Sequence, residues 1–173
     1  LGRAPGRPMQ PAEYQRFFYL EDRHFWFRAT RSIVLDQARE VVAAGARVLD
    51  LGCGTGGTLQ QMPAGWALFG TDFAEAALSF TRRRGPWPLS RASAEALPFA
   101  EGSFDAVFAL DVLEHCDHDR LALDEIRRVL RPGGWLVLTV PAFSWLWSAH
   151  DVAVHHRRRY RKAEVAALLE AAG

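Results

Sequence analysis

The sequence predicts an α/β fold in which helices cover both faces of a mostly parallel β-sheet, giving three layers. Two observations support this class. Short apolar runs alternate with amphipathic helical stretches, and such alternation is typical of parallel strands joined by right-handed crossovers. In addition, the apolar run at residues 47–51 leads directly into a glycine-rich loop, a frequent arrangement where a parallel sheet binds a nucleotide-like ligand.

Composition narrows the class further. A chain of 173 residues that is 49% hydrophobic fits one globular domain with a sizeable core. The net charge of +1 creates no strong field for nucleic acid or a membrane surface. The most apolar stretch, residues 135–147, is too short to span a bilayer and contains Pro141, so we expect no transmembrane segment. With only Cys53 and Cys116 and no signal-peptide pattern, we expect a cytoplasmic protein without a disulfide framework.

The N-terminal part, residues 1–29, is predicted to be a leader followed by a helical lid segment. Glycine and proline are frequent in residues 1–9, which indicates a loose leader. A first helix is predicted to start at Pro11, where the missing N–H of proline does no harm. A second helix is predicted at residues 30–44, with Gly45 as its C-terminal cap.

The remaining elements follow from the alternating pattern. We expect strands at residues 47–51, 66–71, 89–92, 106–110 and 135–140. We expect helices at residues 58–61, 74–84, 119–130 and 162–172. The fourth strand is almost entirely apolar, as a strand covered on both faces is. Pro132, Gly133 and Gly134 are expected to end the helix before the last strand.

The glycine loop after the first strand does not by itself identify its ligand. Gly52, Gly54 and Gly57 fit the dinucleotide pattern G-x-G-x-x-G, whereas Gly52, Gly54 and Gly56 fit G-x-G-x-G. Asp50 helps to discriminate, because a carboxylate beside the loop would repel a pyrophosphate. S-adenosylmethionine (SAM) carries an ammonium and a sulfonium instead, so the charge favours SAM.

The segment at residues 50–56 resembles the first motif of class I SAM-dependent methyltransferases. Further segments match that family in order, at residues 70–72, 96–99, 104–115 and 130–134. The resemblance implies a Rossmann-like, three-layer α/β/α sheet with strand order 3-2-1-4-5. It also implies a C-terminal hairpin of two more strands, so we expect residues 30–173 to be a SAM-binding methyltransferase domain that is C-terminally incomplete.

The resemblance also implies which residues bind SAM. Asp50 would bind the ammonium, and Asp72 would accept hydrogen bonds from the ribose hydroxyls, although either acid could instead cap the turn that follows it. Ser93 stands where many family members carry an acid, so Ala94 or Glu95 would contact the adenine. The expected cofactor-binding set is Asp50, Gly52, Cys53, Gly54, Gly56, Asp72, Phe73, Ala94, Glu95, Leu110, Asp111, Val112 and Arg28.

The methyl acceptor is harder to place, because displacement on an activated donor requires alignment more than a catalytic group. Two regions are candidates for closing the site, residues 24–28 and residues 143–160. The candidates for proton handling are His115, His156, Asp151 and Tyr160. Further candidates for contact with the acceptor are Trp145, Trp147, Arg158 and Arg159. We expect no metal, because the His-x-x-His run at residues 115–118 lacks a partner pair elsewhere.

Taken together, the residues predict a methyltransferase that acts on a small-molecule or lipid-like acceptor. The alternative is a catalytically silent SAM-binding sensor or partner subunit. An NAD-dependent oxidoreductase is less favoured, because no catalytic constellation for hydride transfer is visible. Nucleic acid is not expected as a partner, since residues 157–159 form only a short basic run. The sequence does not predict the oligomeric state.

Overall fold

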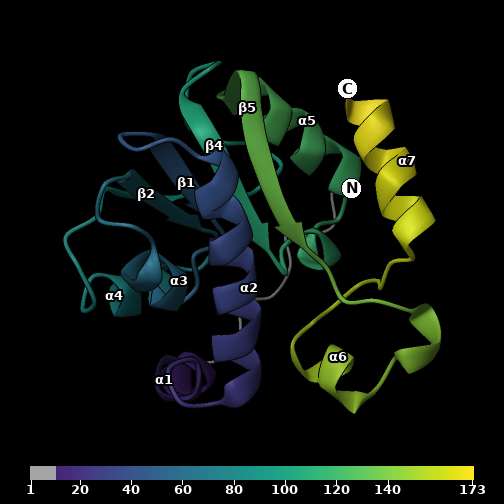
Figure 1. The fold of residues 1–173 in the computed structure, drawn as a ribbon. Coiled ribbons are helices and arrows are strands. Elements are labelled where there is room, and N and C mark those ends of the chain that lie inside the picture. The colour runs from purple at the N-terminus through teal and green to yellow at the C-terminus, as the bar shows by residue number, and fades with distance from the viewer. Residues whose placement is uncertain (1–10) are drawn as a thin grey trace.

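The computed structural model describes residues 11–173. The chain forms a five-stranded sheet with helices on both faces (Figure 1). The predicted leader at residues 1–9 lies outside the described residues. The helices are α1 (Pro11–Leu20), α2 (Phe25–Val41), α3 (Gly57–Gln61), α4 (Glu75–Thr81), α5 (Asp119–Val129), α6 (Ala149–Ala153) and α7 (Lys162–Ala172), with 3₁₀ turns η1 (Leu113–His115) and η2 (Ser144–Leu146). The strands are β1 (Arg47–Leu51), β2 (Ala67–Asp72), β3 (Leu89–Arg91), β4 (Phe104–Leu110) and β5 (Leu130–Thr139).

The strand order is β3-β2-β1-β4-β5 and every neighbouring pair is parallel, which confirms the predicted order. β1 lies at the centre and pairs with β2 from Arg47 to Leu51 and with β4 from Val48 to Leu51. The strand order reverses between β1 and β4. In open α/β sheets, ligands bind beyond the carboxyl ends of the strands at this point.

The core has two parts, one on each face of the sheet. Leu49 and Val107 pack with α5 residues such as Ile126 on one face, whereas Val48 and Phe108 pack with α2 and α4 on the other. Adjacent residues of a strand point to opposite faces, so β1 and β4 need apolar side chains at nearly every position. This arrangement confirms the predicted three-layer α/β/α architecture.

Helix α2 differs from the prediction at both ends. It begins at Phe25 rather than residue 30, because the ring of His24 accepts a hydrogen bond from the backbone N–H of Trp26 (3.4 Å) and caps the helix. The predicted boundary between residues 29 and 30 therefore falls inside one helix. The prediction of Gly45 as a helix cap was wrong: α2 ends at Val41, and Gly45 turns the chain with φ of +80°.

Strand β5 also begins earlier than predicted. Helix α5 ends at Val129, and Leu130 already pairs with Phe104. The register shifts before Trp135 pairs with Ala106, so the Pro-Gly-Gly segment forms an irregularity in the strand rather than ending the helix. Helix α6 and the turn η2 lie in the segment after β5 for which we predicted no elements.

One buried arginine joins the N-terminal segment to the rest of the domain. Arg84, with a side chain only 4% exposed, forms ion pairs with Glu21 and Asp22, each at 2.8 Å. Its guanidinium also donates to the backbone carbonyls of Phe18 and Thr55, each at 2.8 Å. A buried ion pair stabilises only when its remaining hydrogen bonds are satisfied, and here they are satisfied by α1 and by the glycine loop.

Within residues 11–173, no helix is both long enough and apolar enough to cross a membrane. Cys53 and Cys116 are buried and free.

Candidate functional site

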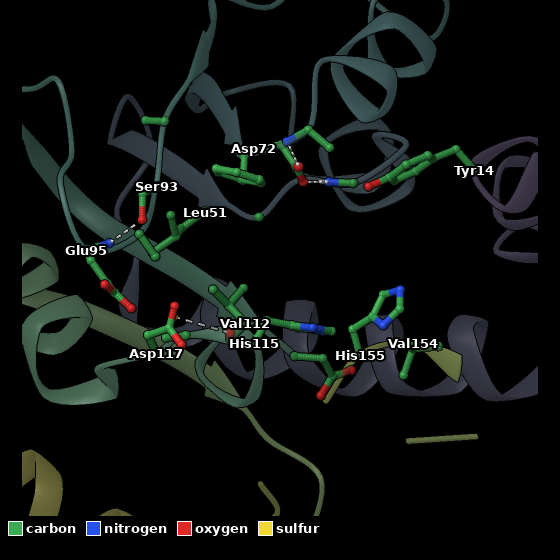
Figure 2. A pocket seen from close by; sticks show the side chains of 18 residues that line it. Tyr14, Leu51, Asp72, Ser93, Glu95, Val112, His115, Asp117, Val154 and His155 are labelled. Carbon is green, nitrogen blue, oxygen red and sulfur yellow. Dashed lines mark hydrogen bonds between the residues drawn. The ribbon is translucent and has the colours of Figure 1, made fainter. Parts of the chain in front are cut away.

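A cavity of about 310 Å³ opens at the carboxyl edge of the sheet. Figure 2 shows Asp72 and Tyr14 on one side of it and Val112, His115 and His155 on the other. The lining residues come from six segments of the chain: Tyr14; Leu51, Gly52 and Gly54; Asp72, Phe73 and Ala74; Ala92, Ser93, Ala94 and Glu95; Asp111, Val112, His115, Cys116 and Asp117; Val154 and His155. The cavity thus gathers most, but not all, of the predicted cofactor residues.

The glycine loop depends on residues without a Cβ. Gly52, Gly54 and Gly56 have φ values of +70°, +56° and +85°, which other L-residues rarely adopt. A Cβ at Gly52 would lie 2.6 Å from a methyl carbon of Val112. Gly52 and Gly54 line the cavity, whereas Gly56 packs against Thr81 of α4. The loop therefore presents bare backbone to the cavity.

Asp72 ties the loop to the end of β2. Its Oδ2 accepts a hydrogen bond from the N–H of Gly54 (2.9 Å), and its Oδ1 accepts one from the N–H of Ala74 (2.8 Å). Burial raises its pKa, and these two hydrogen bonds oppose the shift. Asp72 therefore binds the backbone just before α4, as expected if it capped that turn, and it also lines the cavity. Each oxygen keeps acceptor capacity for a ligand hydroxyl.

Asp50 is buried beneath the loop at the end of β1, and only 2% of it is exposed. Its Oδ2 has no hydrogen-bond partner within residues 11–173. Burial raises the pKa of Asp50 to about 8, the charges of Asp72 and Glu21 add to the shift, and Arg31 opposes it. A buried carboxylate oxygen without a donor favours a proton or a ligand cation. The surroundings of Asp50 thus favour a cationic group over a pyrophosphate, and Asp50 itself does not line the cavity.

The adenine side of the predicted site is formed by residues 92–95. The hydroxyl of Ser93 accepts a hydrogen bond from the N–H of Glu95 (3.2 Å), so Ser93 fixes the turn. The carboxylate of Glu95 accepts from the N–H of His118 (2.8 Å). Ala94 and Glu95 both line the cavity, as does Phe73. These positions are consistent with the predicted roles, which remain predictions.

Asp111 has an unusual backbone conformation, with φ of +54°. Its N–H donates to the carbonyl of Thr139 (3.0 Å), and the hydroxyl of Thr139 donates to its carboxylate (3.1 Å). Burial raises the pKa of Asp111. Non-glycine residues in the left-handed region are held by their surroundings and cluster at functional sites. Asp111 and Val112 both line the cavity.

Like Asp50, four other members of the expected cofactor set do not line the cavity. Cys53 and Gly56 are packed behind the loop, and Leu110 packs into the core. Arg28 is exposed and lines a separate hollow, so the structure does not bring it to the cofactor cavity. On the same helix, Arg31 lies closer to the loop, beside Gly57; it is 8% exposed and donates to the backbone carbonyl of Glu21.

Among the predicted catalytic residues, only His115 lines the cavity. Burial, and then the nearby charges of His156, His155 and Arg157, lower the pKa of His115 to about 4. Its imidazole is therefore neutral near pH 7 and offers a nitrogen lone pair. His156 lies behind it, with the two rings edge to face and 4.9 Å between centroids.

Asp151 is fully buried and does not line the cavity. It accepts hydrogen bonds from the guanidinium of Arg159 (2.7 Å), from Nδ1 of His156 (2.9 Å) and from the N–H of Ser148 (2.8 Å). The Arg159 guanidinium holds the pKa of Asp151 well below its usual range. This ionised, fully engaged carboxylate is not placed for proton transfer with an acceptor; it orients His156 instead.

Tyr160 is also outside the cavity. It is 5% exposed and packs in the core, where its hydroxyl donates to Oδ2 of Asp119 (3.0 Å). Burial raises the pKa of Tyr160. The predicted proton-handling role is therefore not supported by its position, which is structural.

The basic run at residues 157–159 is neutralised within the chain. Arg157 pairs with Asp117, Arg158 with Asp119 (2.9 Å) and Arg159 with Asp151. Each arginine of the run thus has a carboxylate partner, so the run does not form a free anion-binding patch. Trp145 and Trp147 are exposed and do not line the cavity either.

Tyr14 and Glu114 were not assigned to the site from the sequence, and His155 was included only as part of residues 143–160. Tyr14 and His155 line the cavity. Glu114 is fully buried in η1, and neither of its carboxylate oxygens has a hydrogen-bond partner in the part of the chain that the structure describes. Burial and then the charge of Asp111 raise the pKa of Glu114 to about 8. The sequence signal for Glu114 was its place directly after the apolar pair Val112 and Leu113.

The fold and the site define a class of protein: an α/β domain that binds a nucleotide-like, positively charged ligand at the switch point of its sheet. A family profile described as "Methyltransferase domain" matches residues 49–138. The chain belongs to this family, and the predicted membership of the class I SAM-dependent methyltransferases, with SAM as the cofactor of the class, is confirmed.

Curated relatives agree with this assignment. A "Probable S-adenosylmethionine-dependent methyltransferase" of Mycolicibacterium smegmatis is 32% identical over 158 residues, which is 89% of this chain and 61% of that protein. The O-methyltransferase resE of Aspergillus sclerotiorum is 37% identical over 120 residues, which is 64% of this chain and 44% of that protein. The chain thus spans less than two thirds of either relative.

Solved structures show the same fold. One is a complex between the Haloferax volcanii Trm112 methyltransferase activator and a methyltransferase. It superposes with a TM-score of 0.80 at 26% identity, covering 96% of this chain and 76% of that one. Haemonchus contortus phosphoethanolamine N-methyltransferase 2, solved with SAM, gives a TM-score of 0.79 at 19% identity, covering 95% and 41%. The second likeness shows the fold alone.

Proposed function

We propose that the protein uses SAM to methylate a small-molecule or lipid-like acceptor. The observation that supports this most strongly is the unpaired Oδ2 of Asp50, buried below a bare glycine loop at the edge of the cavity. SAM would supply a methyl group on a sulfonium, which is already activated. The protein then has to bind the donor, align the acceptor and exclude water.

The cofactor half of the cavity is the half rich in carboxylates. Asp50 would bind the ammonium, Asp72 the ribose hydroxyls, and Asp111 would lie near the positive methionyl part. Ala94 and Glu95 would contact the adenine. Carboxylates arranged around a cationic ligand lower its binding free energy more in a water-poor cavity than in bulk water. The same arrangement disfavours NAD, whose pyrophosphate is anionic.

The acceptor would enter from the side of His115 and His155, both of which line the cavity. The neutral imidazole of His115 can accept a hydrogen bond from an acceptor hydroxyl or amine. Relatives named for their reactions include two O-methyltransferases and demethylmenaquinone methyltransferases. These names support a hydroxylated or quinone-like acceptor, without identifying one.

Calorimetry tests the cofactor assignment. We expect SAM to bind and NAD not to bind, and we expect Asp50→Asn to weaken SAM binding by at least tenfold. Asp36→Asn is a matched control, because Asp36 is an exposed acid of α2 remote from the cavity. Failure of SAM to bind, or an equal loss in both variants, would refute the proposal.

A turnover assay distinguishes an active methyltransferase from a catalytically silent SAM-binding protein. Release of S-adenosylhomocysteine would be measured with a panel of phenols, quinols and hydroxylated lipids. SAM binding without turnover on any of them would favour the sensor or partner-subunit alternative. We also propose a reducing, cytosolic setting, since both cysteines are free. A nucleic-acid acceptor is not proposed, because the arginines of residues 157–159 are paired internally.

A further inference from the structure

Glu114 has an environment that the proposed methyl transfer does not explain. Its side chain is fully buried at the start of the segment after β4. Both carboxylate oxygens lack a hydrogen-bond partner among the described residues. Burying a carboxyl group without donors is costly, and native proteins rarely leave both oxygens unsatisfied. A group that satisfies this carboxylate is therefore to be expected.

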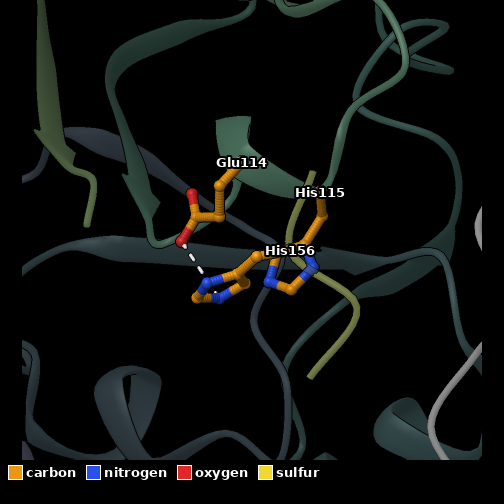
Figure 3. Close-up of side chains that lie close together, drawn as sticks. All are labelled: Glu114, His115 and His156. Atoms are coloured by element: carbon orange, nitrogen blue, oxygen red, sulfur yellow. Dashed lines mark ion pairs between the residues drawn. The ribbon is translucent and has the colours of Figure 1, made fainter. Parts of the chain in front are cut away.

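Two histidines face Glu114 (Figure 3). Nε2 of His156 lies 3.8 Å from Oε1 of Glu114. His115, the neighbour of Glu114 in the chain, places its ring edge to face with His156. One donor atom from each of the three side chains can be chosen so that all lie within 4.8 Å of one another. His115 also lines the cavity, so this cluster reaches the acceptor side.

The hydrogen bonds of His156 define which nitrogen is free. Its Nδ1 is 2.9 Å from Oδ1 of Asp151, whose charge is fixed by Arg159. An ionised carboxylate accepts hydrogen bonds only, so the Nδ1 atom carries a proton. In the neutral ring the lone pair is then on Nε2, directed toward the oxygen of Glu114. A carboxylate–histidine pair of this kind is the usual support of a metal-binding imidazole.

We propose that Glu114, His115 and His156 bind a divalent transition-metal ion, with Zn²⁺ as the best match. Two imidazole nitrogens and one carboxylate oxygen suit Zn²⁺ and are poor ligands for Mg²⁺ or Ca²⁺. Tetrahedral ligands at about 2.1 Å from one ion are about 3.4 Å apart, whereas the donor atoms here lie within 4.8 Å of one another, so the widest pair needs to close by up to about 1.4 Å. Three protein ligands leave a position open for an oxygen of the acceptor.

The role of the ion, unlike its binding, rests on the proposed function. A metal-bound acceptor hydroxyl would lose its proton at lower pH, because the ion stabilises the oxyanion. The proton would leave to water, the oxyanion would form the new bond to the methyl carbon, and the electron pair of the broken sulfur–carbon bond would stay on sulfur. We expect the acceptor to carry a phenol or enol oxygen, because a bound metal ion would ionise such a hydroxyl readily near neutral pH.

Metal binding can be measured on the full chain without SAM. The chelator-treated protein would be titrated with Zn²⁺ by calorimetry and with Co²⁺ by visible absorption. We expect one ion per chain, and at least tenfold weaker Zn²⁺ binding in Glu114→Gln and His156→Gln. The partly exposed His115→Gln provides a third variant that leaves the buried residues in place. His118→Gln, which changes an exposed histidine outside the cluster, is the control and should bind as the wild type does.

The proposal is overturned if the wild type binds no Zn²⁺, or if folded His115→Gln, checked by circular dichroism, binds it as tightly as the wild type. Binding of Mg²⁺ in preference to Zn²⁺ would overturn the choice of metal. SAM calorimetry on the same samples keeps the two proposals apart. Zn²⁺ binding without SAM binding would refute the proposed function alone, and SAM binding without Zn²⁺ binding would refute the metal site alone.

Discussion

The affinity for SAM should depend on pH through Asp50. In the ligand-free protein, burial and then the charges of Asp72 and Glu21 raise the pKa of Asp50 to about 8, against the opposing effect of Arg31. Asp50 is therefore mostly protonated below pH 7. A bound ammonium stabilises the ionised carboxylate, so binding has to displace the proton. Affinity should then fall as the pH is lowered.

The size of the effect follows from that pKa. One unit below it, about nine tenths of the protein carries the proton, and each further unit lowers the ionised fraction tenfold. We expect the Kd for SAM to weaken roughly tenfold from pH 7 to pH 6 and roughly tenfold again from pH 6 to pH 5, which is about 1.4 kcal/mol per unit. The amino-acid part of SAM changes its charge little in this range.

Calorimetry at pH 5, 6 and 7 measures both the Kd for SAM and the number of protons released when SAM binds. Repeating each titration in two buffers with different ionisation enthalpies gives the number of protons released, which we expect to be close to one per SAM at pH 6. Asp50→Asn removes the titrating group, so its weaker binding should show little pH dependence. Asp36→Asn, on the exposed face of α2, should keep the slope of the wild type.

A Kd that is constant between pH 5 and pH 7, with no proton released, would refute this reasoning. So would Asp50→Asn with an unchanged slope, because another group would then be titrating. The free protein offers an independent check. Since the folded chain holds a proton that the unfolded chain loses near pH 4, stability without ligand should decrease as the pH rises from about 4 to about 8.

Three further predictions concern single side chains. Asp72→Ala should weaken SAM binding at least several-fold and should also lower the melting temperature, because the hydrogen bonds to the glycine loop and to the start of α4 are lost. Gly52→Ala should abolish SAM binding, since its Cβ would lie 2.6 Å from Val112 and the residue has φ of +70°; wild-type affinity by calorimetry would contradict this. Tyr160→Phe should cost about 1 kcal/mol of unfolding free energy in urea through the lost bond to Asp119, and should leave the Kd for SAM unchanged.

The centre of the sheet could be predicted closely because β1, β2 and β4 are short, mostly apolar runs. The bounds of β1 agree with the prediction at both ends. The bounds of the other strands differ from the prediction by one or two residues, except that β5 begins five residues earlier. The start of α2 was missed because its cap is a histidine ring rather than one of the common capping side chains. Asp72 and Asp111 line one cavity because parallel strands bring their carboxyl ends to one edge of the sheet, whereas Asp50 is buried and does not line it.

The acceptor side was predicted less well, because it depends on contacts between distant segments. Polar residues after β5 were interpreted as facing a ligand, whereas Asp151 and Arg159 bind each other and Tyr160 binds Asp119. Charged residues are almost never buried alone, but the sequence does not show which partner each one finds. Arg28 and Arg31 lie three residues apart in α2, and the sequence does not show which of them is buried. The hydrogen bond from Arg31 to the carbonyl of Glu21 identifies Arg31 as the buried residue.

The contacts of Arg84 imply that parts of the domain should open together. One guanidinium holds the last turn of α1, the residues that follow it and the glycine loop, so none of them can separate without leaving a buried cation unsatisfied. Amide hydrogens in these segments should therefore show a common free energy of opening in deuterium exchange, as one cooperative unit. Occupancy of the loop by a ligand should then slow exchange in α1, although α1 reaches the cavity only through Tyr14.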